Sequence, residues 1–299
     1  MLQAHLIVNP SARAVTPSQT RAVAAALAGV VHLDVSVTAS AGAAVSQARS
    51  AARGGADVVI AFGGDGLVNG VVNGLVGTEA ALGVVPGGTM NVFARSLGAP
   101  RGPIEAARRL AERIGGGDVT RVDLGRANGR FFTFSCGSGF DAEAAARVEG
   151  HRRAKHRLGE PYFYAAAVTT LVASYAVRSP FLRCDGPFTP RRAVMAIALT
   201  GRPYAYLAGR PVRLGRGARP SEGLSLFVVP ELRVWRMPGY ALGVLGSGRF
   251  GPGAELIEGL PSLTISSARP FAAHVDGEGL EPSDRVELEY VASALPVVG

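Results

Sequence analysis

The sequence predicts an N-terminal α/β domain built on a parallel sheet, followed by a mostly β C-terminal domain of the β-sandwich type. The chain has 299 residues, more than one domain usually holds. Short apolar runs alternate with Ala-rich helical runs up to about residue 120, whereas later apolar runs are separated by turns. We therefore place the domains at 1–122 and 123–287, and expect the tail of about 288–299 to return to the first domain.

The expected elements of the first domain follow from its apolar runs. In order, they are the strand AHLIVNP, the helix 17–30, the strand HLDVSVT, the helix 41–54, the strand ADVVIAFGG, a helix after GGDG, the strand ALGVVPGG and the helix 103–115. The strand at 58–62 is apolar at every position, which is typical of a parallel sheet covered by helices on both faces. Leu67, Val71 and Leu75 lie four residues apart and predict the helix after GGDG.

The second domain contains the strand-like runs FFTFSCGSGF, RAVMAIALT, GLSLFVV and SLTISS, with turn-rich segments between them. Residues 161–177 are the exception, because they carry no charge and would measure about 25 Å as a helix. A membrane-spanning helix must cover about 30 Å, and this segment also contains polar residues. We expect a buried or surface-seated helix.

Composition excludes several classes of site. Basic residues outnumber acidic ones by 31 to 23, and the net charge of +8 favours an anionic partner such as a nucleotide, a phospholipid surface or a nucleic acid. Lys155 is the only lysine, and neither a GxxxxGK[ST] loop nor a VAIK-type lysine is present. Cys136 and Cys184 lack CxxC spacing, so neither a disulfide framework nor a zinc site is indicated and a reducing cytosol fits best. The N-terminus has no secretory-signal pattern.

The segment AFGGDGLVNG at 61–70 ends a buried strand in Gly63, Gly64, Asp65 and Gly66, and a helix begins at once. Glycines let the backbone approach an anion closely, and a helix N-terminus offers unpaired N–H groups, so this turn suits phosphate. A carboxylate in such a place implies a bridging divalent cation or a proton to be moved. The alternative is a tight turn in which Asp65 caps the helix.

Two further strands end in similar loops. The run VVPGGTMNVFARSLG places Thr89 and Asn91 before an apolar helix, and IVNPSAR ends in Arg13, which can pair with phosphate. If the strands are neighbours, the loops overlook one crevice at the carboxyl edge of the sheet, where ligands bind in open α/β sheets. As the alternative, Thr89 and Ser11 are ordinary helix caps.

The series NPSA, GGDGLVNGVVNGL, PGGTMNVFAR, GSGFDAE and HVDGEGL resembles, in this order and spacing, the diacylglycerol kinase catalytic-domain family, which includes bacterial soluble lipid kinases and sphingosine kinases. The resemblance covers nearly the whole chain. GGDG is shared with NAD kinases and 6-phosphofructokinases, so a first domain like theirs is implied. PGGTxN followed by FAR and a late DGE is more particular to the lipid kinases.

The resemblance implies ATP as phosphate donor and Mg²⁺ as cofactor. With the loops above, the candidate nucleotide-binding residues are Asn9, Pro10, Ser11, Arg13, Thr38, Gly63, Gly64, Asp65, Gly66, Leu67, Asn69, Gly88, Thr89 and Asn91. The candidate catalytic residues are Asp65 and, from the family's DGE, Asp276 and Glu278; the glutamate is held to take the proton of the lipid hydroxyl. A hairpin turn at Asp276–Gly277 is the alternative.

Five positions depart from the family pattern, and one of them is Ala12, which stands where the NPxSG loop usually has a glycine. Leu67 stands in place of a threonine, Gly70 in place of a glutamate and Val92 in place of an aspartate. Glu222 stands where some bacterial members have an aspartate that helps to hold a structural magnesium. Glutamate also ligates hard cations, although its extra methylene moves the oxygens, so Glu222 is the implied metal ligand.

These observations predict an ATP- and Mg²⁺-dependent lipid kinase that phosphorylates a hydroxyl of diacylglycerol or a related lipid. An NAD kinase or other small-metabolite kinase with the same GGDG core is the alternative enzyme. A nucleotide-binding regulator without catalysis is the alternative from another class, motivated by Leu67, Gly70 and Val92. A nucleic-acid partner is not expected, because the arginines are spread along the chain.

A membrane surface is the other expected partner. The run Arg147–Arg157 holds five basic residues and one acid directly before the uncharged helix. Such a run is usually a solvated face, but beside a hydrophobic helix it can seat a protein on an anionic membrane. We expect a cytoplasmic, peripherally membrane-associated protein, with a homodimer left open. Asp141 in GSGFDAE is expected near the cleft between the domains, with helix capping as the alternative.

Overall fold

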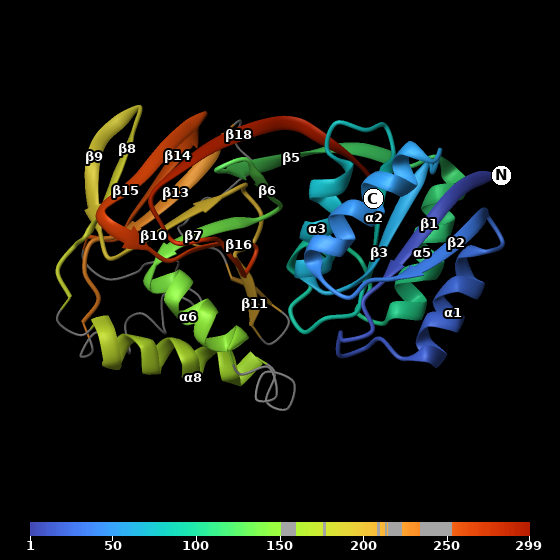
Figure 1. The fold of residues 1–299 in the computed structure, drawn as a ribbon, viewed down its shortest axis with the longest axis horizontal. Coiled ribbons are helices and arrows are strands. Elements are labelled where there is room, and N and C mark those ends of the chain that lie inside the picture. The colour runs from blue at the N-terminus through green and yellow to red at the C-terminus, as the bar shows by residue number, and fades with distance from the viewer. Residues whose placement is uncertain (151–159, 176–177, 208–209, 213, 215–222, 234–252) are drawn as a thin grey trace. The chain divides into compact units, whose positions relative to one another are not determined.

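The computed structural model describes residues 1–150, 160–175, 178–207, 210–212, 214, 223–233 and 253–299. The chain divides into two compact units, Met1–Leu124 with Ala292–Gly299 and Gly125–Val291 (Figure 1). The strands β5 (Val119–Ala127) and β18 (Ser283–Val298) contribute residues to both units. Each unit contains its own hydrophobic core.

Unit 1 is an open parallel sheet with helices on both faces, as predicted. Its strands are β1 (Leu2–Val8), β2 (Val31–Val37), β3 (Val58–Gly63) and β4 (Ala81–Pro86), in the order β2-β1-β3-β4, with the end of β18 added beside β4. Its helices are α1 (Pro17–Leu27), α2 (Ala41–Arg53), α3 (Asp65–Leu75), α4 (Val92–Ser96) and α5 (Pro103–Gly116). Helix α1 packs on α5, and α2 packs on α3. Every residue of β3 and β4 is buried, because helices cover the sheet on both sides.

The strand order creates a topological switch point in this sheet, between β1 and β3. Strand β1 lies between β2 and β3 and pairs in parallel with both. The chain leaves β1 toward β2 on one side and leaves β3 toward β4 on the other, and in open α/β sheets this is where the carboxyl ends of the strands bind ligands. The loops that follow β1 and β3 are neighbours at this point.

Unit 2 is a β-sandwich flanked by helices. One sheet has the order β14-β13-β10-β7-β16-β17, with β7 (Ser135–Gly139), β10 (Met195–Leu199), β13 (Leu224–Val229), β14 (Glu255–Leu260), β16 (Ala273–Val275) and β17 (Glu278–Gly279). The other contains the first part of β18, then β15 (Ser262–Phe271), β8 (Leu182–Gly186) and β9 (Phe188–Ala193), while β5 pairs with β18 and with β6 (Arg130–Phe132). A separate ribbon joins β11 (Ala205–Leu207) to β12 (Arg210–Val212).

The alternation of side chains in β10 shows how the layers form. Ala196 and Ala198 belong to the core shared by the two sheets, whereas Ile197 and Leu199 pack on the opposite face against Tyr175. That face is covered by helices, and they are α6 (Phe140–Glu149), α8 (Glu160–Thr170) and the π-helical turn η1 (Leu171–Tyr175). Figure 1 shows α6 and α8 below the strands of this unit. The six-stranded sheet is therefore apolar on both faces.

The uncharged segment 161–177 is helical, as predicted, over its described part. Leu171 and Tyr175 are buried, whereas Val168 and Val172 are exposed on the outer side. The helix is thus seated on the surface of unit 2. Among the residues that the structure describes, no helix has both the length and the apolar character needed to cross a membrane.

Candidate active site

The three predicted phosphate loops meet at the carboxyl edge of the sheet in unit 1. The Asn9 N–H donates to the Phe62 carbonyl at 3.0 Å, which ties the loop after β1 to the end of β3. The Gly87 N–H donates to the Gly63 carbonyl at 2.7 Å, and the Ala14 N–H donates to the Gly87 carbonyl at 2.9 Å. Backbone hydrogen bonds thus hold the loops after β1, β3 and β4 together.

Glycine is needed where two of these loops touch. A Cβ atom added to Gly88 would lie 2.6 Å from the Cα of Gly64, closer than real Cβ atoms approach a backbone. A Cβ atom added to Gly87 would lie 3.1 Å from the Cα of Gly63. The paired glycines of GGDG and PGG are therefore required because the backbones of the two loops are in direct contact.

Helix α3 begins at Asp65 directly after β3, and its N-cap residue Gly64 provides no side chain to cap it. The alternative in which Asp65 caps its own helix is wrong. The Asp65 Oδ1 atom instead accepts the N–H of Phe93 at 3.2 Å, in the first turn of α4. The N-terminus of α3 therefore has no side-chain cap. It lies at the edge of the sheet, half-buried next to the Asp65 carboxylate.

Asn91 closes the loop between β4 and α4. Its backbone is left-handed, with φ of 48°, and it occupies the N-cap position of α4. Its Oδ1 atom accepts the Gly88 N–H at 2.8 Å, and its Nδ2 atom donates to the Gly88 carbonyl at 2.9 Å. Asn91 therefore organises the loop, and the alternative in which Thr89 caps this helix is wrong.

The loop after β1 is the most exposed of the three. The Asn9 Oδ1 atom accepts the Ser11 N–H at 3.0 Å, which makes a local turn and leaves Pro10, Ser11 and Arg13 exposed. The N-cap of α1 is Thr16, so the alternative in which Ser11 caps a helix is wrong as well. The Arg13 side chain is the cation that this loop presents to solvent.

Four of the candidate nucleotide-binding residues are buried inside unit 1; one is Gly63 at the end of β3, and the other three carry side chains. Thr38 is 2% exposed, its N–H donates to the Val8 carbonyl, and its hydroxyl donates to the Ser40 carbonyl at 2.9 Å. Leu67 and Asn69 are 3% and 0% exposed within α3. In this structure these three side chains support the loops from behind, whereas Gly64, Asp65, Gly66, Gly88, Thr89 and Asn91 are half-buried at the surface.

Asp276 lies in unit 2, at a two-residue turn between β16 and β17. The turn residues Asp276 and Gly277 have φ of 51° and 86°, and Val275 pairs with Glu278 across the hairpin. Positive φ at both central positions defines a type I′ turn, so the hairpin turn foreseen as the alternative is present.

The Asp276 carboxylate is 5% exposed and accepts four hydrogen bonds. Its Oδ2 atom accepts the Thr133 N–H at 2.7 Å and the Thr133 hydroxyl at 2.9 Å. Its Oδ1 atom accepts the N–H groups of Phe134 at 3.0 Å and Ser135 at 3.2 Å. Asp276 thereby anchors the turn to the strand region at 133–135.

Glu278 follows this turn as the first residue of β17 and is half-buried. Within the part of the chain that the structure describes, its carboxylate has no hydrogen-bond or ion-pair partner. The carboxylate of Asp276 is therefore held by hydrogen bonds, whereas the carboxylate of Glu278, only two residues later, has no such partner in the described part of the chain. A carboxylate without internal partners is available to a ligand.

A buried polar network behind the turn joins Asp141 to two residues that the sequence analysis did not select, His274 and Tyr204. The His274 Nε2 atom lies 2.8 Å from Asp141 Oδ2, and the Tyr204 hydroxyl donates to Asp141 Oδ1. The Gly277 N–H donates to His274 Nδ1 at 3.2 Å, which places the proton on Nε2. Asp141 thus joins α6 to the hairpin. A histidine inside the apolar run FAAHV was the signal that could have identified this network.

The implied metal ligand Glu222 lies outside the described residues, as does most of the basic run Arg147–Arg157. Among the residues the structure does describe, no three His, Cys, Asp or Glu side chains gather as a metal site. Asp65 is the carboxylate of the glycine loops, so the other ligands of a cation held there would come from a bound molecule or from water.

Comparisons with known proteins point to one family. The model of the diacylglycerol kinase catalytic domain matches residues 3–127. The diacylglycerol kinase of Bacillus subtilis is 39% identical over 129 residues, which are 42% of this chain and 41% of the relative, so the match spans less than half of that protein. The diacylglycerol kinase of Staphylococcus saprophyticus is 26% identical over 244 residues, covering 81% of this chain and 76% of the relative.

The fold has a counterpart among solved structures. The crystal structure of a diacylglycerol kinase from Bacillus anthracis superposes with a TM-score of 0.76 at 22% sequence identity. The superposition covers 99% of this chain and 96% of the other. Both the α/β unit and the β-sandwich unit are therefore found in a solved structure.

Proposed function

We propose that the protein is an ATP- and Mg²⁺-dependent lipid kinase acting on a hydroxyl of diacylglycerol or a related lipid, because residues 3–127 match the model of the diacylglycerol kinase catalytic domain. In this proposal, residues 1–122 with the tail bind the nucleotide and 123–287 bind the lipid. The observation that carries it is the meeting of three loops around the uncapped N-terminus of α3.

Unit 1 offers what the phosphates of ATP need. The first turn of α3 presents backbone N–H groups and the positive end of the helix dipole, and Gly64 and Gly66 leave room for an anion to approach. Arg13 supplies a charged donor from the loop after β1. Backbone groups and an arginine would thus do the work that a lysine does in other phosphate sites.

The loops also fit Mg²⁺, because this ion is commonly held by one or two carboxylates together with substrate phosphates. Asp65 would be the protein ligand in unit 1, and Glu222 remains the predicted ligand of a second, structural ion. When bound, Mg²⁺ would neutralise charge on the transferred phosphoryl group. The hydrogen bond from the Phe93 N–H fixes the position of the Asp65 carboxylate.

Unit 2 would supply the base. In the proposed step, the carboxylate of Glu278 takes the proton of the lipid hydroxyl while the hydroxyl oxygen bonds to the γ-phosphorus. The bond from the γ-phosphorus to the bridging oxygen breaks, and ADP leaves with the electron pair. Asp276 would act as a positioning residue, because four hydrogen bonds already occupy its carboxylate.

Peripheral attachment to an anionic membrane belongs to the same proposal, since the lipid substrate resides in a bilayer. The exposed Val168 and Val172 on the surface helix support it, and the adjacent basic run would add electrostatic attraction. A homodimer remains a prediction.

The experiment is transfer of labelled γ-phosphate from ATP with Mg²⁺ to diacylglycerol, a sphingoid base and NAD, using wild type, Asp65→Asn and the exposed control Asp34→Asn. The proposal expects label in a lipid with wild type and the control, and none with Asp65→Asn. Label in NAD would show a small-metabolite kinase instead. ATP binding without transfer to any acceptor would show a nucleotide-binding regulator, and either outcome would overturn the proposal.

A further inference from the structure

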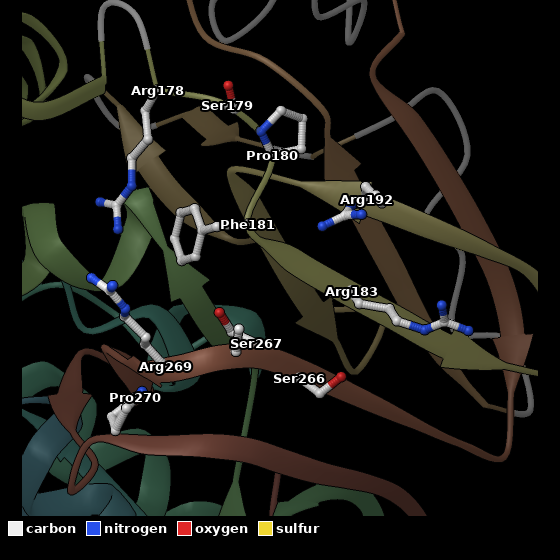
Figure 2. Close-up of a pocket in the computed structure, with 11 residues that line it drawn as sticks. Arg178, Ser179, Pro180, Phe181, Arg183, Arg192, Ser266, Ser267, Arg269 and Pro270 are labelled. Atoms are coloured by element: carbon white, nitrogen blue, oxygen red, sulfur yellow. The ribbon is translucent and has the colours of Figure 1, made fainter.

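A pocket of chemical interest lies wholly within unit 2. It has a volume of about 620 Å³ and is formed by the segment 178–181 together with parts of β8, β9 and β15 (Figure 2). Four of its lining residues are arginines, and none of them is acidic. None of the residues proposed for phosphoryl transfer lines it.

The charges of this pocket are only half compensated. Arg178 pairs with Glu143 at 3.0 Å, and Arg183 pairs with Asp185 at 2.8 Å. Arg192 and Arg269 have no acidic partner in the described part of the chain. Two positive charges therefore remain to attract an anion.

The side chains are arranged to meet a ligand. In Figure 2 the guanidinium groups of Arg178 and Arg269 point toward one another, Arg192 points into the pocket, and Arg183 points away from it. Arg178 is held in place, because its Cζ atom lies 3.9 Å from the centroid of the Phe181 ring and its NH1 group bonds to Glu143. Arg192 and Arg269 are carried by β9 and β15, strands of one sheet.

The pocket combines anion donors with an apolar wall. The hydroxyl groups of Ser266 and Ser267 line it beside the arginines, and its apolar lining comes from Pro180, Phe181 and Pro270. Guanidinium forks match the oxygens of phosphate better than other charged side chains do. The volume and the apolar wall leave room for the carbon skeleton that bears the phosphate.

We propose that this pocket binds the phosphate group of an organic phosphate, either a soluble one or the headgroup of a phospholipid. Arg192 and Arg269 provide the uncompensated charge, Arg178 is the pre-positioned donor, and the serine hydroxyls complete the set of donors. The site is separate from the glycine loops of unit 1, so it does not depend on the proposed kinase activity.

The test uses the full-length chain and two classes of probe. Inorganic phosphate and glycerol 3-phosphate are titrated by calorimetry, and binding to vesicles of phosphatidylcholine is compared with and without phosphatidic acid. The variants are Arg192→Gln, Arg269→Gln and their combination. Arg183→Gln is the matched control inside the pocket, and Arg285→Gln, an exposed arginine paired with Glu287, is the control for net charge.

Each single pocket variant is expected to weaken binding about tenfold, and the double variant more, while the two controls stay within about twofold of wild type. Binding of the soluble probes alone would support a soluble phosphate ligand, and binding only to phosphatidic acid vesicles would support a lipid headgroup. Absence of binding to every probe would overturn the proposal. An equal loss in Arg285→Gln would also overturn it, because general charge would then explain the attraction.

Discussion

His274 and Asp141 are joined by a hydrogen bond of 2.8 Å inside unit 2, between Nε2 and Oδ2, and both residues are buried. The other ring nitrogen of His274 accepts the N–H of Gly277, in the turn that precedes Glu278. The network therefore connects the start of α6 to the hairpin that carries the proposed base. Its partners are 133 residues apart in the chain.

Gly137 makes room for this network. A Cβ atom at this position would lie 1.8 Å from Asp141 Oδ2 and 2.5 Å from His274 Nε2. We expect Gly137→Ala to lower the free energy of unfolding by about 2 kcal/mol, because the pair must separate or shift. Urea denaturation measures the loss. Gly279→Ala, whose Cβ atom would meet nothing within 4 Å, is the control, and an equal loss there would contradict the account.

The stability of an Asp276 variant tests whether this side chain anchors the turn, separately from any role in catalysis. In Asp276→Asn the side-chain NH₂ group must face two of the four donors that the carboxylate now satisfies. The free energy of unfolding should fall by about 3 kcal/mol. The exposed Asp284→Asn should leave it unchanged within about 0.5 kcal/mol. Undiminished stability of Asp276→Asn in chemical denaturation would show that these hydrogen bonds do not hold the turn.

The contact between Gly64 and Gly88 can be tested through nucleotide binding. Gly88→Ala places a Cβ atom 2.6 Å from the Cα of Gly64, so the two loops must move apart. We expect ATP affinity, measured by calorimetry, to fall at least about tenfold. Gly102→Ala, which has open space around its Cβ position, should bind ATP as the wild type does. Normal affinity in Gly88→Ala would show that the packing of these loops is irrelevant to the nucleotide.

The fold class could be predicted because its signals are local. The fully apolar run at 58–62 and its alternation with Ala-rich helices indicate a covered parallel sheet, and the later runs indicate strands. The Asp-Gly pair also predicted the hairpin turn correctly. These signals depend on neighbouring residues, which a sequence displays directly.

The partners of the site residues could not be predicted in the same way. Asp65 bonds to the N–H of Phe93, 28 residues away, and Asp276 bonds to 133–135, more than 140 residues away. Such pairs depend on how distant strands and helices pack. The alternatives in which Ser11 and Thr89 cap helices were wrong, since Thr16 and Asn91 occupy the N-cap positions of α1 and α4.

Stability should fall in alkaline solution because two thiols are buried. Burial raises the pKa of Cys184 to about 12 from its ordinary value of 9.0, and burial also raises the pKa of Cys136, with the charges of Asp276 and Asp141 adding to the effect. The unfolded chain loses these protons near pH 9, whereas the folded chain keeps them. The contribution of these protonated thiols to the free energy of unfolding is therefore fully present below about pH 9, and it is lost as the pH rises toward 12.

Denaturation curves measured from pH 7 to 10.5 would show this decline. Cys184→Ala should be less stable at neutral pH because of the cavity, but its stability should depend less steeply on alkaline pH. An identical slope in the variant would show that the thiol of Cys184 does not contribute.

The most direct test of the account is the rate of lipid phosphorylation by Glu278→Gln, measured at saturating ATP beside wild type and the exposed control Glu281→Gln. We predict that kcat falls at least about a hundredfold in Glu278→Gln, with ATP affinity and unfolding free energy unchanged, and that Glu281→Gln matches the wild type. A Glu278→Gln protein that phosphorylates lipid at the wild-type rate would contradict the assignment of the base. A wild-type protein that phosphorylates no lipid would contradict the proposed function itself.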